Sequence, residues 1–109
     1  MDVFQALSQP HRRSIVELLA KKGQLTSTDI SNEFQISAPA ISQHLKVLRE
    51  AKLIQMEKKA QQRLYRISPD AMHNLQQWIE KMTGLWDDRF EGLDKVLEVE
   101  KKKMRGNHQ

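Results

Sequence analysis

The sequence predicts a mainly α-helical domain with a small β-hairpin, and three observations lead to this prediction. Four segments within residues 2–51 carry apolar side chains at helical spacing. Residues 53–67 then form two short strand-like segments joined by a basic turn. A long segment that starts at Pro69 again has helical periodicity. Four helices, a hairpin and a last helix are the outline of a winged helix-turn-helix, in which the helix before the hairpin can read DNA.

The composition indicates one soluble domain. The chain has 109 residues, of which 39% are hydrophobic and 29% are charged, and this is enough for one modest core. It contains no cysteine, which excludes disulfides, thiolate metal sites and cysteine nucleophiles. No apolar run approaches the roughly 20 residues of a membrane span, and no stretch has the pattern of a signal peptide. We therefore expect a single cytoplasmic domain over residues 1–109.

Charged residues are distributed unevenly along the chain, whose net charge is +4. Residues 37–66 contain seven basic and two acidic residues, which gives this segment a charge of +5. Residues 67–99 contain three basic and seven acidic residues, which gives a charge of −4. A basic segment followed by an acidic one indicates that one surface meets a polyanion, and random scatter on a solvated surface is the alternative.

Two helices are predicted at the start of the chain. The first covers residues 2–7 and has one apolar side. Either Ser8 or Gln9 lies near the N-cap of the second helix, and Pro10 fits its first turn, where a missing N–H does no harm. Two lysines followed by Gly23 are typical of a helix end, since glycine adopts the left-handed conformation easily.

The third and fourth helices form the predicted helix-turn-helix. The third covers residues 25–34, with Thr26 as its N-cap and Asp29 able to return a bond in a capping box. Ser37 caps the fourth helix, which ends near residues 51–52. A connection of about three residues, followed by a helix that opens with small polar side chains, is typical of this motif.

The predicted hairpin follows directly. Its first strand covers residues 53–58, its turn residues 59–62 and its return strand residues 63–67. Charged and apolar residues alternate in the return strand, as expected for a strand with one buried face. Leu64 and Ile67 do not share one face of a regular strand, so the sequence leaves the register open.

The last predicted helix covers residues 69–103, with Ser68 as its N-cap, and would be about 50 Å long at ~1.5 Å per residue. Such a helix is longer than this domain needs for its own core, so we expect it to pair with a second copy; covering its own domain is the alternative. At Gly84 and Gly92 the sequence is compatible with close packing against another helix, with a kink or with a break in the helix. The predicted seam consists of Met72, Leu75, Ile79, Met82, Trp86, Phe90, Leu93 and Leu97.

Three segments resemble a known family. They read LSQPHRRSIVELL in the second helix, ISAPAISQHLKVLREAKLI in the fourth helix and first strand, and RLYRISPD before the last helix. Together they resemble the ArsR-type winged helix-turn-helix transcriptional regulators, over residues 3–98. The pattern of Trp78, Trp86, Phe90 and Leu93 is similar to a branch of that family without obvious metal-binding residues.

The chain departs from the family pattern at two positions. Relatives usually have glycine where this chain has Lys52, just after the fourth helix, and in the turn where it has residues 60–62. A left-handed conformation costs a lysine about 1 kcal/mol or more, so a reshaped helix end is one expectation.

The resemblance implies a homodimeric repressor that places two recognition helices in successive major grooves of an inverted-repeat operator. Side chains near the N-terminus of such a helix reach base edges, and Gln43 can form two bonds to adenine. The expected DNA contacts are Ser37, Ala38, Ala40, Ser42, Gln43, His44 and Lys46 in the fourth helix and Lys58, Lys59, Gln61 and Arg63 in the hairpin. The expected dimer contacts are Val3, Phe4, Leu7, Trp78, Met82, Leu85, Trp86, Phe90 and Leu93.

Other classes of function have less support from the sequence. Asp70 and His73 could share a helix face, but two ligands make a poor metal site, so no metal or cofactor is expected. No nucleophile and base pair, phosphate-binding loop or paired carboxylates indicate an enzyme. His11 is expected to be an ordinary surface residue. A winged-helix dimerisation or adaptor module that makes protein contacts without specific DNA binding is the remaining alternative.

Overall fold

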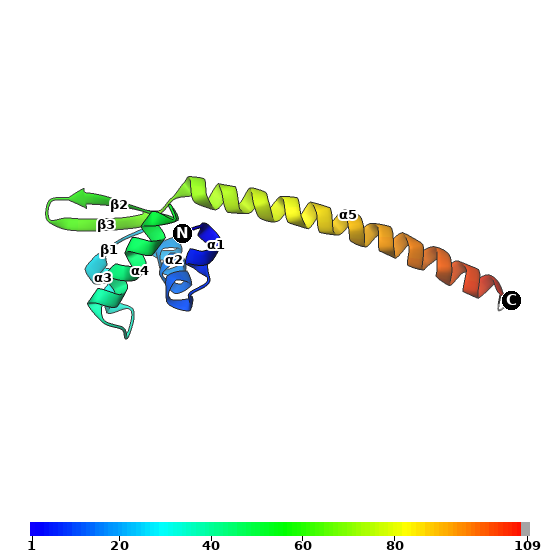
Figure 1. The fold of residues 1–109 in the computed structure, drawn as a ribbon, viewed down its shortest axis with the longest axis horizontal. Coiled ribbons are helices and arrows are strands. Elements are labelled where there is room, and N and C mark those ends of the chain that lie inside the picture. The colour runs from blue at the N-terminus through cyan, green and yellow to red at the C-terminus, as the bar shows by residue number, and fades with distance from the viewer. Residues whose placement is uncertain (108–109) are drawn as a thin grey trace. The chain divides into compact units, whose positions relative to one another are not determined.

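The computed structural model describes the backbone of residues 1–107 and the side chains of residues 1–89. The chain divides into two compact units, Met1–His73 and Asn74–Gln109. No described helix is both long and apolar enough to cross a membrane. In chain order (Figure 1) the elements are α1 (Val3–Leu7), α2 (Pro10–Lys22), β1 (Gln24–Thr26), α3 (Ser27–Asn32), α4 (Ala38–Glu50), β2 (Ile54–Lys59), β3 (Gln62–Ile67) and α5 (Pro69–Asn107).

Side chains cap the N-termini of the first two helices, and a glycine ends the second. Asp2 and Gln5 form a capping box at the start of α1. Gln9, not Ser8, caps α2, because its side-chain oxygen accepts a hydrogen bond of 2.9 Å from the backbone N–H of the residue three positions later. The helix ends at Gly23, whose φ of 87° is a conformation that favours glycine.

The prediction that the third helix begins at residue 25 was wrong. Residues 24–26 form the short strand β1, in which Leu25 pairs with Tyr65 of β3. Thr26 is both the last residue of β1 and the N-cap of α3, since its extended backbone serves both roles. The predicted capping box is confirmed, because Thr26 and Asp29 bond each other's backbone N–H groups.

The sheet has three antiparallel strands in the order β1-β3-β2, where the sequence predicted only a hairpin. The pairing of Met56 with Tyr65 and of Lys58 with Arg63 settles the register. Residues that lie directly opposite each other point to the same face, so these four side chains share the face that packs on the helices, and Leu64 lies on the other. The β2–β3 hairpin is called the wing below, and its turn projects beyond α3 and α4 (Figure 1).

Among residues 1–107, two non-glycine residues adopt left-handed backbone conformations, Lys52 with φ of 62° and Ala60 with φ of 56°. Lys52 follows α4, where its N–H bonds the carbonyl of Arg49 and the N–H of Leu53 bonds that of Leu48, at 2.9 and 3.0 Å. This is a Schellman motif, in which glycine is the usual residue. The helix end is therefore not reshaped, and Lys52 bears a cost of about 1–2 kcal/mol.

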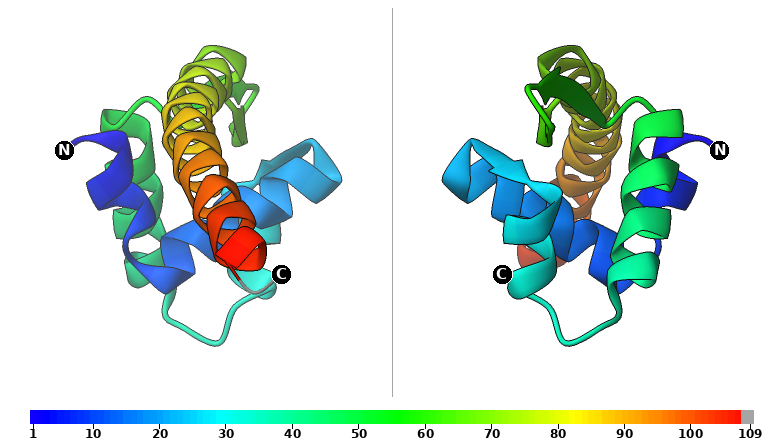
Figure 2. Two further views of the ribbon diagram at one scale, coloured as in Figure 1. Left: turned by 90° about the vertical axis from the view of Figure 1, so that its right-hand side faces the viewer. Right: turned by 90° about the vertical axis from the view of Figure 1, so that its left-hand side faces the viewer.

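The core lies in the unit Met1–His73, and the buried face of α4 packs in it. Figure 2 shows α1 beside α4, and these two helices are in contact. Ala6 of α1 and Tyr65 of β3 are also buried. The largest fully buried side chains are Ile15, Leu19, Ile30, Ile41, Leu45, Leu48 and Leu53, which come from α2, α3, α4 and the segment that follows α4.

Helix α5 continues through both of its glycines. It has helical backbone from Pro69 to Asn107, so neither Gly84 nor Gly92 divides it. Its first residues, including the buried Ala71, belong to the unit Met1–His73, and the remainder forms the second unit.

Candidate nucleic-acid interface

Helix α4 has a buried face and an exposed polar face. Ile41, Leu45 and Leu48, spaced four and three residues apart, are at most 2% exposed. Because a helix turns about 100° per residue, Ser42 and Lys46 fall on the other side, and both are exposed. The core therefore fixes which side chains of α4 a partner can reach.

The start of α4 is fixed by its cap. The Ser37 hydroxyl accepts a hydrogen bond of 3.2 Å from the backbone N–H of Ala40. It can still donate its own proton to a phosphate oxygen. Ser37, Ala38, Ser42 and Gln43 are exposed and Ala40 is half-buried, so the predicted base-reading residues gather on the N-terminal half of the helix.

Arg49 extends this exposed face and was missing from the predicted contacts. It is exposed and lies one turn after Lys46 and two turns after Ser42. The spacing of these three residues, four and then three, was visible in the sequence and could have identified it.

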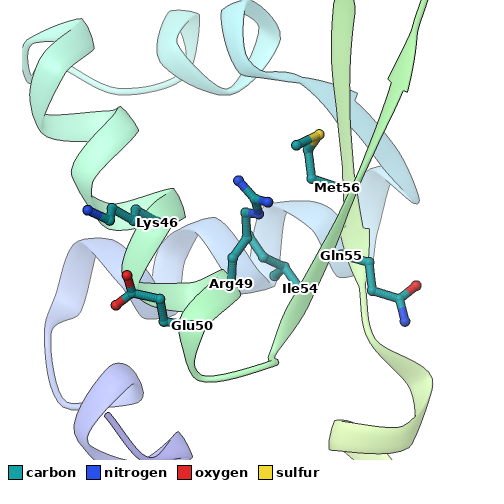
Figure 3. Close-up of a pocket in the computed structure, with 6 residues that line it drawn as sticks. All are labelled: Lys46, Arg49, Glu50, Ile54, Gln55 and Met56. Atoms are coloured by element: carbon teal, nitrogen blue, oxygen red, sulfur yellow. The ribbon is translucent and has the colours of Figure 1, made fainter.

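A groove of about 540 Å³ separates α4 from the first strand of the wing (Figure 3). In Figure 3 the Arg49 side chain extends into the space between the helix and Met56, whereas Gln55 points away from the helix. Gln55 instead accepts a hydrogen bond of 3.1 Å from Nε of Arg66. The lining residues are Lys46, Arg49, Glu50, Ile54, Gln55 and Met56.

The predicted contacts of the wing surround its tip. Lys58, Lys59, Gln61 and Arg63 are all exposed. Lys58 lies directly opposite Arg63, and two like charges in that relation destabilise a strand pair. A polyanion such as DNA would relieve this repulsion, so the arrangement favours a phosphate contact.

His44 is half-buried, whereas its neighbours Ser42, Gln43 and Lys46 are exposed. Its half-buried ring is stacked on His11 of α2, with ring centroids 5.8 Å apart and planes at 19°. His11 also makes an edge contact with Phe34 at 6.5 Å. The expectation that His11 is an ordinary surface residue was wrong, because the sequence does not show which side chains of α2 and α4 meet.

The predicted dimer residues lie on both units. In α1, Phe4 is 53% exposed, whereas Val3 and Leu7 are half-buried. In α5, Trp78, Met82, Leu85 and Trp86 are 36–64% exposed. Phe90 and Leu93 lie outside the residues whose side chains are described. Within residues 1–89, no three His, Cys, Asp or Glu residues are arranged to hold a metal ion.

Comparison with known proteins gives a consistent result. Residues 9–56 match a family described as bacterial regulatory protein, arsR family. The chain is 38% identical to the transcriptional repressor SdpR of Bacillus subtilis, over 72% of this chain and 86% of that protein. It is 33% identical to the arsenic resistance transcriptional regulator ArsR1 of Pseudomonas putida, over 84% and 69%. A crystal structure of a possible transcriptional regulator for arsenical resistance is 34% identical, with a TM-score of 0.67 and coverage of 75% and 84%.

Proposed function

This chain belongs to the ArsR family of bacterial regulatory proteins, and from this membership we propose that it acts as a homodimeric repressor on an inverted-repeat operator. It is a DNA-binding transcriptional regulator, as its relatives are. Membership of a family of regulators gives no support for a catalytic role of this chain. Because a bacterial regulator meets its operator in the cytoplasm, we place the protein there.

The exposed polar face of α4 is the observation that carries this proposal. A major groove admits one helix, and Ser42 and Gln43 are presented on the side of α4 opposite its buried face. Gln43 would bond an adenine edge. Lys46 and Arg49, which line the protein groove next to the wing, would bind the phosphate backbone of the DNA. In this arrangement α4 supplies sequence preference and the wing supplies phosphate contacts.

A second copy of the chain is the proposed partner of α5. Ile79, Met82 and Trp86 recur at spacings of three and four residues, and every described side chain of residues 76–89 is exposed. Apolar side chains at that period form a helix-pairing seam. To bind half-sites separated by one turn of DNA, a twofold dimer must hold its two α4 helices about 34 Å apart.

Selection of bound sequences from a random duplex pool tests DNA recognition. We expect recovered sequences to contain an inverted repeat with half-site centres about 10 base pairs apart. Affinity should fall steeply as salt rises, because bound phosphates release counterions. Recovery of no preferred sequence, together with a flat salt response, would contradict the proposal and favour the adaptor module.

Sedimentation of Trp86→Glu tests the dimer. A charge on the apolar seam should yield monomers, and these should bind the recovered duplex much more weakly because each contacts one half-site. Gln77→Glu is the matched control, since it adds the same charge to an exposed position on another face of α5. A dimer that persists in Trp86→Glu would exclude this part of α5 as the interface.

A further inference from the structure

The stacked rings of His11 and His44 join α2 to the recognition helix α4, which bears the base-reading residues. We propose that this stack is a proton-sensitive contact that seats α4, so that His44 is a positioning residue and DNA binding weakens on acidification. The inference rests on the proposed DNA-binding function. It gives His44 a different role from the base contact that the sequence predicted.

A hydrogen bond from Gln9 fixes the ring of His11. The side-chain oxygen of Gln9 is engaged with the backbone N–H of Arg12 at 2.9 Å, which fixes the orientation of the Gln9 amide. Its nitrogen, Nε2, therefore faces Nδ1 of His11, at 3.1 Å. An amide nitrogen only donates, so this Nδ1 must accept.

The surroundings of His44 also favour its neutral form. Its Nδ1 atom is buried and has no hydrogen-bond partner among the described residues. A neutral ring can leave this nitrogen as a bare acceptor, whereas a protonated ring must bury an N–H there without a partner. An unpaired buried donor costs free energy, and the charge of a half-buried ring loses part of its hydration as well.

A fixed positive charge lies beside the stack. Nε of Arg12 donates to the carbonyl of Ala6 at 2.7 Å, and its Nη2 donates to that of Gln5 at 3.3 Å. These two bonds hold the guanidinium at the end of α1 and limit its movement away from a charged His44. Burial lowers the pKa of His44, and the charges of Arg12 and His11 lower it further.

The other elements packed against α4 do not offset these charges. α1 and α3 contribute the carboxylates of Asp2 and Asp29, each of which is engaged in its own capping box. Glu33 at the end of α3 is exposed. β2 carries the exposed Glu57 on the face away from the helices, followed by two lysines. Arg12 carries the charge that acts most strongly on His44, and it favours the neutral ring.

The sign of the pH effect separates the two roles of His44. A histidine that contacts DNA gains a positive charge on acidification, so its affinity for phosphates rises. A histidine that seats α4 through the stack acts in the opposite direction, because protonation repels α2 and displaces the helix that carries Gln43. Weaker binding at low pH is therefore specific to the positioning role.

The test compares the full wild-type chain with His44→Phe, which keeps a flat ring for the stack and removes the ionisable nitrogens. Kd for the duplex recovered from the random pool is measured at pH 7.5 and 5.5, at constant ionic strength. We expect wild type to bind about three- to tenfold more weakly at pH 5.5, and His44→Phe to lose most of this change. Far-UV circular dichroism verifies that both proteins are folded at each pH.

His73→Gln is the matched control, because His73 is an exposed histidine of α5 outside the stack. It should keep the wild-type pH dependence. Wild-type binding that tightens at pH 5.5 would overturn the inference. The same loss of affinity in His44→Phe as in wild type would also overturn it.

Thermal unfolding tests the stack without DNA. A histidine whose pKa is lowered on folding accepts a proton more readily in the unfolded chain, so its contribution to stability is complete above about pH 6.5 and declines below it. Wild type should therefore lose more Tm than His44→Phe between pH 7.5 and 5.5. If no duplex binds at any pH, the proposed function fails, and the melting comparison alone decides whether the stack is sensitive to protons. An equal loss of Tm in both proteins overturns it.

Discussion

The recognition helix and the wing both present polar and basic side chains, but the core supports them differently. α4 is capped at both ends and fixed by buried residues such as Leu45 and Leu48. In the wing, all of residues 57–63 are exposed. A helix held by close packing keeps its side chains in fixed positions, as base recognition requires. An exposed hairpin tip can follow a phosphate backbone, for which position matters less than charge.

Removal of the buried support of α4 should have the largest effect. Leu48 is fully buried, so Leu48→Ala should lower the free energy of unfolding by about 2–5 kcal/mol, through lost apolar burial and a residual cavity. Chemical denaturation measures the change. Lys59→Ala, at the exposed tip of the wing, should leave stability almost unchanged. Equal losses in the two variants would show that the wing is as well supported as the helix.

Specificity should respond to a change at the exposed face of α4. Gln43→Ala should reduce discrimination at one base pair by about 1–3 kcal/mol while leaving the fold intact. Competition between the recovered duplex and single-base variants measures this difference. Gln77→Ala removes an exposed glutamine from α5 and should change no base preference. Undiminished discrimination in Gln43→Ala would locate base reading elsewhere.

Much of this contrast could be predicted from the sequence, because its causes are local. The cap at Ser37, the capping box of Thr26 and the buried face of α4 each depend on residues within one or two turns. The basic residues of the wing were likewise recognisable from the sequence alone. Such patterns identify an element and its exposed face without knowledge of the tertiary structure.

The remaining features depend on partners far away in the chain. β1 has only three residues and is defined by its pairing with β3, about 40 positions later, so no alternation could reveal it. The stack of His44 on His11 likewise depends on how α2 and α4 pack. Arg49 was missed for another reason. Its spacing was visible, but only the structure shows that it lines the groove beside β2.

Removal of charge from the wing should weaken binding without changing preference. The double substitution Lys58→Ala with Arg63→Ala should lower affinity for all duplexes and reduce the salt slope by about two. Binding isotherms at several salt concentrations measure this slope. Lys21→Ala with Lys22→Ala removes the same charge from the exposed end of α2. An equal reduction there would show that total charge, rather than the wing, sets the slope.

The smallest effects concern the two left-handed residues, Lys52 and Ala60, one in each region. Glycine relieves a strain of about 1–2 kcal/mol at such positions but also costs about 0.5–1 kcal/mol of unfolded-chain entropy. Lys52→Gly should therefore raise the free energy of unfolding by up to about 1.5 kcal/mol, because this Schellman motif joins α4 to the buried Leu53. The turn at Ala60 lies among exposed residues that can open locally before the core unfolds, so Ala60→Gly should change global stability less. Hydrogen exchange separates the two effects. Ala60→Gly should slow exchange only in residues 57–63, and slower exchange throughout α4 would mean that the wing and the helix unfold as one unit.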